Sequence, residues 1–340
     1  MLKAVSTRAR ELGAPSVVVS FDPHPLKVLH PERATKMIQT LRQREEAIEA
    51  SGIDALVLVP FTRDFSLTPA EVFIKELLVK RLAVREVHVG ARFIFGRDRL
   101  GTLDLLRAAG EAAGFRVSGL GDVSDAGGAI SSTRIRNALH DGDAVTAREL
   151  LGRPYAMDGI IAKGDRMGRK IGFPTMNLMA DNELFPKDGV YFTSVRIDSF
   201  ERTFPCVTNI GCRPTVYEEY ATTIESYILD FSSDVYGERV RVSFYGRVRD
   251  EQTFPSMLDL TAQIRRDVEA TRLYFLRNPL PLPRRSCFWS RPSCSLSSSR
   301  EERGTVPPPS PWAPSPDSQS SDGVPTRCLS LAAPHYKRPA

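Results

Sequence analysis

Residues 159–178 read GIIAKGDRMGRKIGFPTMNL, and this glycine-rich stretch determines how the rest of the chain is interpreted. At glycines, backbone N–H groups can approach a phosphate closely, and nearby basic side chains add positive charge. The positions suited to this role are Gly159, Lys163, Gly164, Gly168, Arg169 and Gly172. On glycine content alone, a glycine-rich hairpin with a polar strand face is the simpler interpretation.

The end of this stretch carries a candidate metal site. Thr175 and Asn177 lie two residues apart, so on an extended strand both side chains are on one face. A hydroxyl and an amide oxygen are hard ligands of the kind that Mg²⁺ binds. We therefore predict a strand that presents Thr175 and Asn177 together as magnesium ligands.

The residues that follow, up to about 250, form short alternating segments separated by turn residues. These segments are Tyr191–Ile197, Cys206–Asn209, Thr222–Asp230 and Arg239–Val248. Such a pattern predicts an antiparallel β-barrel or sandwich. Residues 257–276 have helical periodicity and are expected to close this domain.

Residues 1–150 have a different pattern, in which continuous apolar strands alternate with helices. Strands are predicted at 17–21, 55–60, 87–90 and 115–117, and a helix at 40–51. Buried strands separated by helices predict a Rossmann-like parallel sheet covered on both faces. Thr68 as N-cap, followed by Pro69 and by Glu71, predicts a further helix start.

Residues 278–340 form a tail that contains 13 Pro and 13 Ser. Such a composition buries too little apolar surface to offset the entropy of the chain, so we predict disorder. We expect deletion of the tail to leave both the melting temperature and the activity unchanged.

Most of the net positive charge of the chain lies in this tail. The tail contains eight Lys and Arg residues and four acidic residues, which give +4 of the net charge of +5. The rest is nearly neutral, which argues against a nucleic-acid partner. No apolar run reaches the roughly 20 residues of a membrane span, and residues 1–4, Met-Leu-Lys-Ala, lack the apolar core expected of a signal peptide. Cys206 and Cys212, the two cysteines before the tail, have no metal-ligand spacing. We expect a cytoplasmic protein with no membrane partner.

The glycine-rich stretch resembles the flavokinase signature, in which a Gly-rich loop runs into Gly-Phe-Pro-Thr-x-Asn. The resemblance implies that Thr175 and Asn177 bind Mg²⁺ and the phosphates of ATP. Met176 stands where this family usually has Ala, and on a strand it faces away from the ligands.

Two later segments resemble further elements of the same family. Residues 209–215 match an element beside the flavin site, which implies that Asn209 and Arg213 contact the ligand. Residues 225–231 match a third element, with Tyr227 where His is common. The resemblance implies that Glu225 is the base toward the ribityl 5′-hydroxyl, whereas composition alone makes it one of 41 acids.

The first domain resembles the adenylyltransferase half of bacterial bifunctional riboflavin kinase/FMN adenylyltransferases. Residues 130–136 match the Ile-Ser-Ser-Thr-x-Ile-Arg motif, which implies nucleotide binding by Ser131, Ser132, Thr133 and Arg136. A capped helix explains the same hydroxyls when they are taken alone. The family's Gly-x-Phe-Asp-Gly-x-His-x-Gly-His motif, with its first strand, is not found in residues 1–340. Arg92 also stands where the family usually has Asp or Asn.

The sequence therefore predicts three parts: an N-terminally truncated adenylyltransferase-like domain (1–150), a riboflavin kinase barrel (151–277) and the tail. The expected activity is phosphorylation of riboflavin to FMN, with ATP as co-substrate and Mg²⁺ as cofactor. Two alternatives stay open: full bifunctionality with FAD synthesis from FMN, and a non-catalytic protein that binds flavin or nucleotide. Because the histidine motif is missing, we expect little FAD.

Overall fold

The computed structural model describes residues 1–164, 167–214, 220–280 and 327–331. Its contacts divide the chain into two units. The first unit contains residues 1–35, 42–123 and 327–331, and the second contains residues 36–41 and 124–280. In the described part of the chain, no helix is both long and apolar enough to cross a lipid bilayer.

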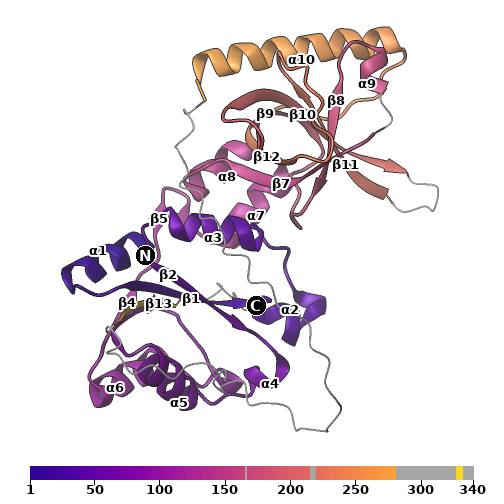
Figure 1. The fold of residues 1–340 in the computed structure, drawn as a ribbon. Helices are drawn as coiled ribbons and strands as arrows, with labels where there is room; N and C mark the ends of the chain where they lie inside the picture. Colours follow the sequence, from indigo (N-terminus) through magenta and orange to yellow (C-terminus); the bar gives the residue numbers. More distant parts are fainter. Residues whose placement is uncertain (165–166, 215–219, 281–326, 332–340) are drawn as a thin grey trace, which may run out of the picture. The chain divides into compact units, whose positions relative to one another are not determined.

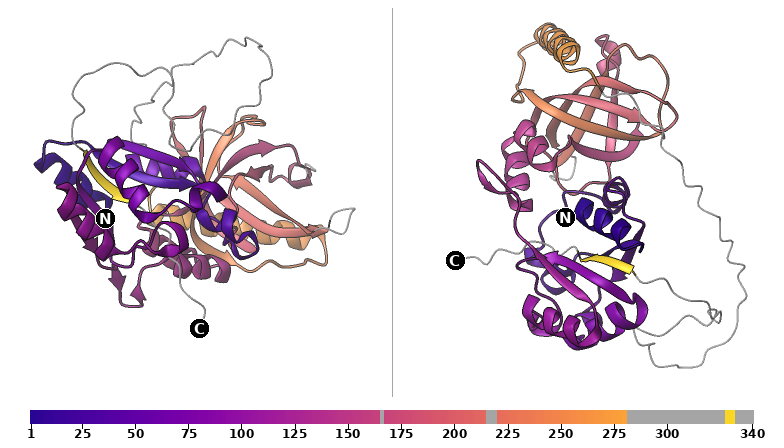
Figure 2. Two further views of the ribbon diagram at one scale, coloured as in Figure 1. Left: turned by 90° about the horizontal axis from the view of Figure 1, so that it is seen from below. Right: turned by 90° about the vertical axis from the view of Figure 1, so that its left-hand side faces the viewer.

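The first unit is built on a five-stranded parallel sheet with the strand order β2-β1-β13-β3-β4 (Figures 1 and 2). In chain order the elements are α1 (Leu2–Glu11), β1 (Ser16–Asp22), α2 (Pro25–Leu29), the 3₁₀ helix η1 (Pro31–Arg33), α3 (Leu41–Glu49), β2 (Ala55–Pro60), α4 (Arg63–Ser66), α5 (Ala70–Phe73), the π-helix η2 (Ile74–Arg81), β3 (Val84–Gly90), the 3₁₀ helix η3 (Arg97–Arg99), α6 (Leu103–Ala113), β4 (Arg116–Leu120) and β13 (Arg327–Leu331). The four strands predicted in this region and the parallel sheet are confirmed.

Both faces of this sheet are covered, which explains the apolar run in β1. Val17 and Val19 belong to one buried cluster, together with side chains of α5, η2 and α6. Val18 points the other way, into a second cluster with Val5 of α1 and Ile48 of α3. Because successive side chains of a strand alternate between faces, a strand covered on both sides is apolar throughout.

The predicted helix start at Thr68 is wrong in its capping residue. Pro69 is the N-cap of α5, and no side chain caps this helix. The backbone of Thr68 is used elsewhere, since its carbonyl accepts a hydrogen bond from the N–H of Arg97 at 2.8 Å. A tertiary contact thus replaces the local capping pattern.

The prediction of a wholly disordered tail is wrong at residues 327–331. These residues form β13, which pairs in parallel with β1 on one side and with β3 on the other. A strand in the centre of a sheet forms backbone hydrogen bonds to neighbours on both sides. These hydrogen bonds outweigh the tendency of the surrounding Pro- and Ser-rich composition to be disordered. The rest of the tail, residues 281–326 and 332–340, lies outside the described residues.

His88 of β3 is a buried titratable side chain of the first unit. Neither ring nitrogen has a hydrogen-bond partner in the described residues, although Nε2 lies 3.3 Å from Oε1 of the buried Glu86. Burial lowers the pKa of His88, against the opposing effect of Glu86.

Buried His88 binds a proton less readily in the folded unit than in the unfolded chain. Protonation therefore favours unfolding: the free energy of unfolding is highest above the ordinary histidine pKa of about 6.5 and decreases as the pH falls below it. We expect the first unit to unfold at lower urea concentration as the pH falls from 8 to 5, and His88→Gln to weaken this trend. An identical pH trend in both proteins would exclude His88 as its cause.

The second unit is a closed antiparallel barrel with the strand order β10-β11-β8-β7-β12-β9. Its elements are β5 (Ser124–Asp125), β6 (Gly128–Ala129), α7 (Ser132–Asp141), α8 (Ala144–Leu151), β7 (Tyr155–Ala162), α9 (Met167–Lys170), β8 (Thr175–Ala180), β9 (Gly189–Ile197), β10 (Thr203–Pro214), β11 (Tyr220–Ile228), β12 (Arg239–Arg249) and α10 (Met257–Arg277). The two architectures left open by the sequence are thus resolved as a barrel, and the closing helix is confirmed.

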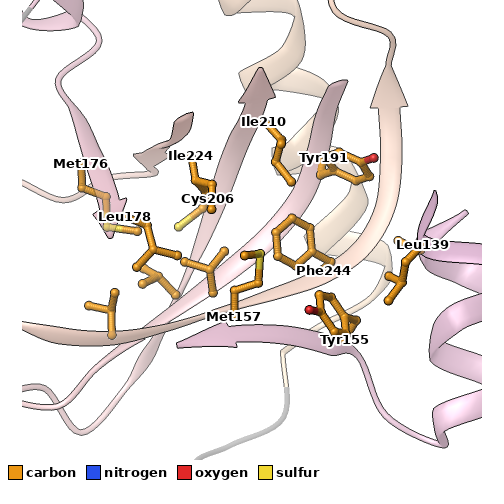
Figure 3. Close-up of a cluster of buried hydrophobic side chains, with 14 of the residues drawn as sticks. Leu139, Tyr155, Met157, Met176, Leu178, Tyr191, Cys206, Ile210, Ile224 and Phe244 are labelled. Atoms are coloured by element: carbon orange, nitrogen blue, oxygen red, sulfur yellow. The ribbon is translucent and has the colours of Figure 1, made fainter. Parts of the chain in front are cut away.

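The barrel is filled by inward-facing side chains from all six strands (Figure 3). In β12, for example, Val240, Val242 and Phe244 are buried and alternate with half-exposed residues. Helices α7 and α8 contribute Leu139 and Leu150 to the same core. For this reason the contacts divide the chain after residue 123, whereas we expected the division after residue 150.

Candidate functional site

The outer face of the barrel gathers the predicted site residues of β8, β10 and β11. In the strand register, Glu225 of β11 lies between Asn177 of β8 and Asn209 of β10. Directly paired residues in neighbouring strands have their side chains on the same face of the sheet. The residues next to them along the strands, Met176 and Ser226, are buried in the barrel. The three polar side chains therefore form a row on the outside.

Thr175 joins this row through Glu225. Its hydroxyl donates a long hydrogen bond of 3.5 Å to Oε2 of the Glu225 carboxylate. Thr175 and Asn177 are both half-buried, while Met176 between them points inward, so the prediction that the two share a strand face is confirmed. The two-residue spacing predicted this face correctly because side chains 175 to 178 of β8 alternate between the two faces of the strand.

The glycine-rich loop lies directly on this row. A Cβ atom at Gly164 would overlap the side-chain amide of Asn177, and one at Gly168 would overlap the carbonyl of Phe173 and lie 3.3 Å from the Thr175 hydroxyl. Only glycine lets the loop backbone come this close. Gly172, with φ of +84°, adopts the left-handed conformation that favours glycine.

We expect Gly164→Ala to lower the rate of the expected reaction, formation of FMN from riboflavin, by about 10²-fold, because a displacement of about 1 Å in a positioning group has an effect of this size. The added methyl group would push Asn177 out of the row. Gly121→Ala is the matched control, since a Cβ atom there meets nothing within 4 Å. Comparable turnover in the two variants would show that the contact between loop and strand is not needed.

The remaining predicted loop residues are not all brought to the row. Gly159 lies inside β7, paired with Ala180 and Val240, and a Cβ atom there would overlap the carbonyl of Met179. Close packing of strands explains this glycine without any ligand. Lys163 and Arg169 are exposed beside the loop. The backbone of Arg213 lies in β10, and its side chain is outside the described part of the structure.

Helix α10 packs on the same outer face. Val268 of this helix joins a cluster with Val190 and Val207 of the barrel, and Tyr227 packs against it. A buried ion pair fixes the helix: the guanidinium of Arg249 binds the carboxylate of Asp267 with distances of 2.8 to 3.2 Å. The sequence analysis missed this pair, because nothing local links residues 18 positions apart.

Two family matches cover successive parts of the chain, and the N-terminal one extends into the second unit. Residues 151–275 match the family described as riboflavin kinase, and residues 1–134 match FAD synthetase. A bifunctional riboflavin kinase/FMN adenylyltransferase of Pseudomonas fluorescens is 38% identical over 272 residues, which are 80% of this chain and 86% of that protein. The chain belongs to the bifunctional riboflavin kinase/FMN adenylyltransferase family.

Two further proteins are similar to this chain over most of its length. A protein of the same name from Escherichia coli K12 is 36% identical over 275 residues, covering 81% of this chain and 87% of the relative. A solved structure described as a macrolide-efflux protein from Streptococcus pneumoniae matches with a TM-score of 0.72 and 32% identity, covering 80% of this chain and 88% of the other.

The adenylyltransferase motif of this family member lies on α7, within the second unit. The Ser131 hydroxyl caps α7 by accepting a hydrogen bond from the N–H of Arg134 at 3.3 Å. Arg136 donates to the carbonyl of Lys36 at 2.9 Å, and burial lowers the pKa of its guanidinium. Ser132 is half-buried and Thr133 is exposed. The capped helix thus accounts for Ser131, and the nucleotide role of the motif stays a prediction.

Magnesium fits the chemistry of the outer row. In the described parts of the chain, no three His, Cys, Asp or Glu side chains gather as a metal site. The oxygens available here come instead from a hydroxyl, an amide and one carboxylate, those of Thr175, Asn177 and Glu225. Such a set suits a cation that takes few protein ligands and fills its remaining positions with phosphate and water.

Proposed function

We propose that the barrel of this chain transfers the γ-phosphate of ATP to the 5′-hydroxyl of the ribityl chain of riboflavin, which forms FMN and ADP. The observation that carries the proposal is the row of Asn177, Glu225 and Asn209, with the Thr175 hydroxyl 3.5 Å from the Glu225 carboxylate. In this proposal Glu225 would be the proton acceptor, next to the oxygens of Thr175 and Asn177 that would bind Mg²⁺ and close to the glycine-rich loop.

Phosphoryl transfer requires positioning, neutralisation of charge and an acceptor for the hydroxyl proton. In this proposal Glu225 takes the proton of the 5′-hydroxyl as its oxygen forms a bond to the γ-phosphorus. The bond from that phosphorus to the bridging oxygen breaks, and ADP leaves. Glu225 is suited to this role because it stands half-exposed between two neutral amides, Asn177 and Asn209.

The ATP phosphates would lie against the glycine loop. The backbone at Gly164 and Gly168 reaches the side chains of Asn177 and Thr175, and exposed Lys163 and Arg169 offer positive charge nearby. Thr175 and Asn177 would hold Mg²⁺, which neutralises phosphate charge when bound. Asn209, beside Glu225, and Arg213 further along β10 would contact the flavin.

A second candidate activity is adenylylation of FMN to FAD. The match of residues 1–134 to FAD synthetase favours it, with Ser131, Ser132, Thr133 and Arg136 as the nucleotide-binding residues. The histidine motif expected for this reaction is not among the 340 residues, and electrostatic stabilisation of the transition state is usually the largest catalytic contribution. We therefore expect the 340-residue protein to accumulate FMN and to form little FAD.

Two incubations separate these activities. Purified protein is incubated with riboflavin and ATP, or with FMN and ATP, in each case with Mg²⁺ and again with excess EDTA, and the flavins are separated by chromatography. We expect FMN in the first incubation, little FAD in the second, and no product with EDTA until Mg²⁺ is restored. Riboflavin that is bound but unchanged would identify a non-catalytic flavin-binding protein.

A further inference from the structure

An aromatic contact joins the glycine-rich loop to strand β11. The rings of Phe173 and Tyr227 meet edge to face, with their centroids 5.3 Å apart and their planes at 77°. This geometry is favourable for two aromatic side chains, because the positive edge of one ring points at the negative face of the other. Both rings are half-buried, and both pack on the apolar cluster that includes Val268 of α10. The contact therefore connects the loop, β11 and α10.

The strand register places Tyr227 beside the residues proposed for catalysis. Tyr227 is paired with Thr175 of β8, and it lies two positions after Glu225 on the outer face of β11. Its ring is thus next to a proposed magnesium ligand and to the proposed base without being either of them. Tyr227 is also a position where this chain differs from the flavokinase family, which commonly has His. A ring at this place is suited to hold neighbouring groups in position.

Phe173 is the residue that closes the turn at the end of the loop. Its backbone N–H donates a hydrogen bond of 2.8 Å to the carbonyl of Gly168, and the N–H of Ile171 donates to the same carbonyl at 3.2 Å. A Cβ atom at Gly168 would overlap the carbonyl of Phe173 and would lie 3.3 Å from the Thr175 hydroxyl. Anchoring the Phe173 ring therefore fixes residues 168–173 beside Thr175.

We infer that Tyr227 is a positioning residue for the nucleotide: its ring holds Phe173, and thereby the turn of residues 168–173, where the backbone receives the phosphates of ATP. The inference rests on the proposed kinase reaction. Without the Tyr227 ring the turn has alternative positions, and only molecules with the turn in place bind ATP tightly. The apparent affinity for ATP falls by the fraction of such molecules. Proton transfer to Glu225 and binding of riboflavin do not depend on this contact.

Tyr227→Leu tests this role, with Tyr245→Leu as the matched control. Tyr245 of β12 is also half-buried and also meets a ring edge to face, that of Phe275 in α10, at 5.3 Å and 85°. We expect the KM for MgATP in FMN formation to rise about 3- to 10-fold in Tyr227→Leu, the size expected for the loss of one aromatic pair. The kcat and the dissociation constant of riboflavin should stay unchanged. Tyr227→Phe, which keeps the ring, and Tyr245→Leu should both have the wild-type KM.

Hydrogen exchange provides a second measurement that needs no turnover. The amides of Ile171 and Phe173 should exchange about 3- to 10-fold faster in Tyr227→Leu, because the turn that they close has lost its anchor. They should exchange at the wild-type rate in Tyr227→Phe and in Tyr245→Leu. If Tyr227→Leu does not fold, the comparison of Phe173→Leu with Tyr245→Leu decides the same question, since Phe173→Leu removes the partner ring.

A double variant tests whether the two rings act through each other. Phe173→Leu should raise the KM for MgATP by a factor similar to that of Tyr227→Leu, and the double variant should be no weaker than either, because all three lack the same contact. Losses that multiply in the double variant would overturn the inference. So would an unchanged KM for MgATP in Tyr227→Leu, or weaker riboflavin binding in its place. Absence of FMN formation by the wild type would refute the proposed reaction, and the exchange rates would still decide whether the ring holds the turn.

Discussion

Glu225→Gln is expected to lower the rate of FMN formation by about 10²- to 10⁴-fold, the usual contribution of one acid–base residue. The substitution keeps the size of the side chain and its place between Asn177 and Asn209 but removes the carboxylate that accepts the proton. The melting temperature and the binding of riboflavin, measured by quenching of flavin fluorescence, should change little.

Glu201→Gln is the matched control for this variant, since Glu201 is exposed in the turn between β9 and β10. It should retain wild-type turnover. Wild-type turnover in Glu225→Gln would show that Glu225 is not the base of the reaction. A general loss of structure in this variant would show that Glu225 is needed for folding and not for proton transfer.

Asp267→Asn is expected to destabilise the barrel unit by about 3 kcal/mol, because it leaves the guanidinium of Arg249 without its charged partner in a largely buried place. The side chains of Arg249 and Asp267 are only 17% and 4% exposed. Unfolding in urea, followed by circular dichroism, measures this loss directly. Helix α10 should fray first, since this pair fixes it to β12.

A second ion pair between α10 and the barrel provides the control. Arg272 binds Asp230 with distances of 2.6 and 2.7 Å, but the two side chains are 40% and 70% exposed. Exposed pairs contribute about 0–1 kcal/mol, so Arg272→Gln should change stability little. Equal losses in the two variants would show that burial does not distinguish these ion pairs.

Regular local patterns made most of the fold predictable from the sequence. The unbroken apolar run at 17–19 indicated a strand covered on both faces, and the alternation from 239 to 244 indicated a strand of an antiparallel barrel or sandwich. Thr175 and Asn177 were correctly predicted to share a face because two-residue spacing on a strand has only one geometric consequence. Motif order then connected residues of three strands that the fold places side by side.

Long-range contacts account for what the sequence did not reveal. The strand at 327–331 acquires its partners from β1 and β3, which are more than 200 residues away, and its local composition favours disorder. Gly159 was grouped with the loop, although strand packing explains it. Arg249 and Asp267 belong to different elements, so no spacing rule connects them. Each of these features depends on which elements meet in space.

A single-turnover experiment tests the central claim most directly. Protein in excess over riboflavin is mixed with Mg²⁺ and ATP labelled in its γ-phosphate, and the labelled products are separated over time. The account predicts that the label appears in FMN in the same amount as ADP, and that Glu225→Gln binds riboflavin while the label stays in ATP. Label released only as free phosphate by the wild type, or label transferred to riboflavin at the wild-type rate by Glu225→Gln, would contradict it.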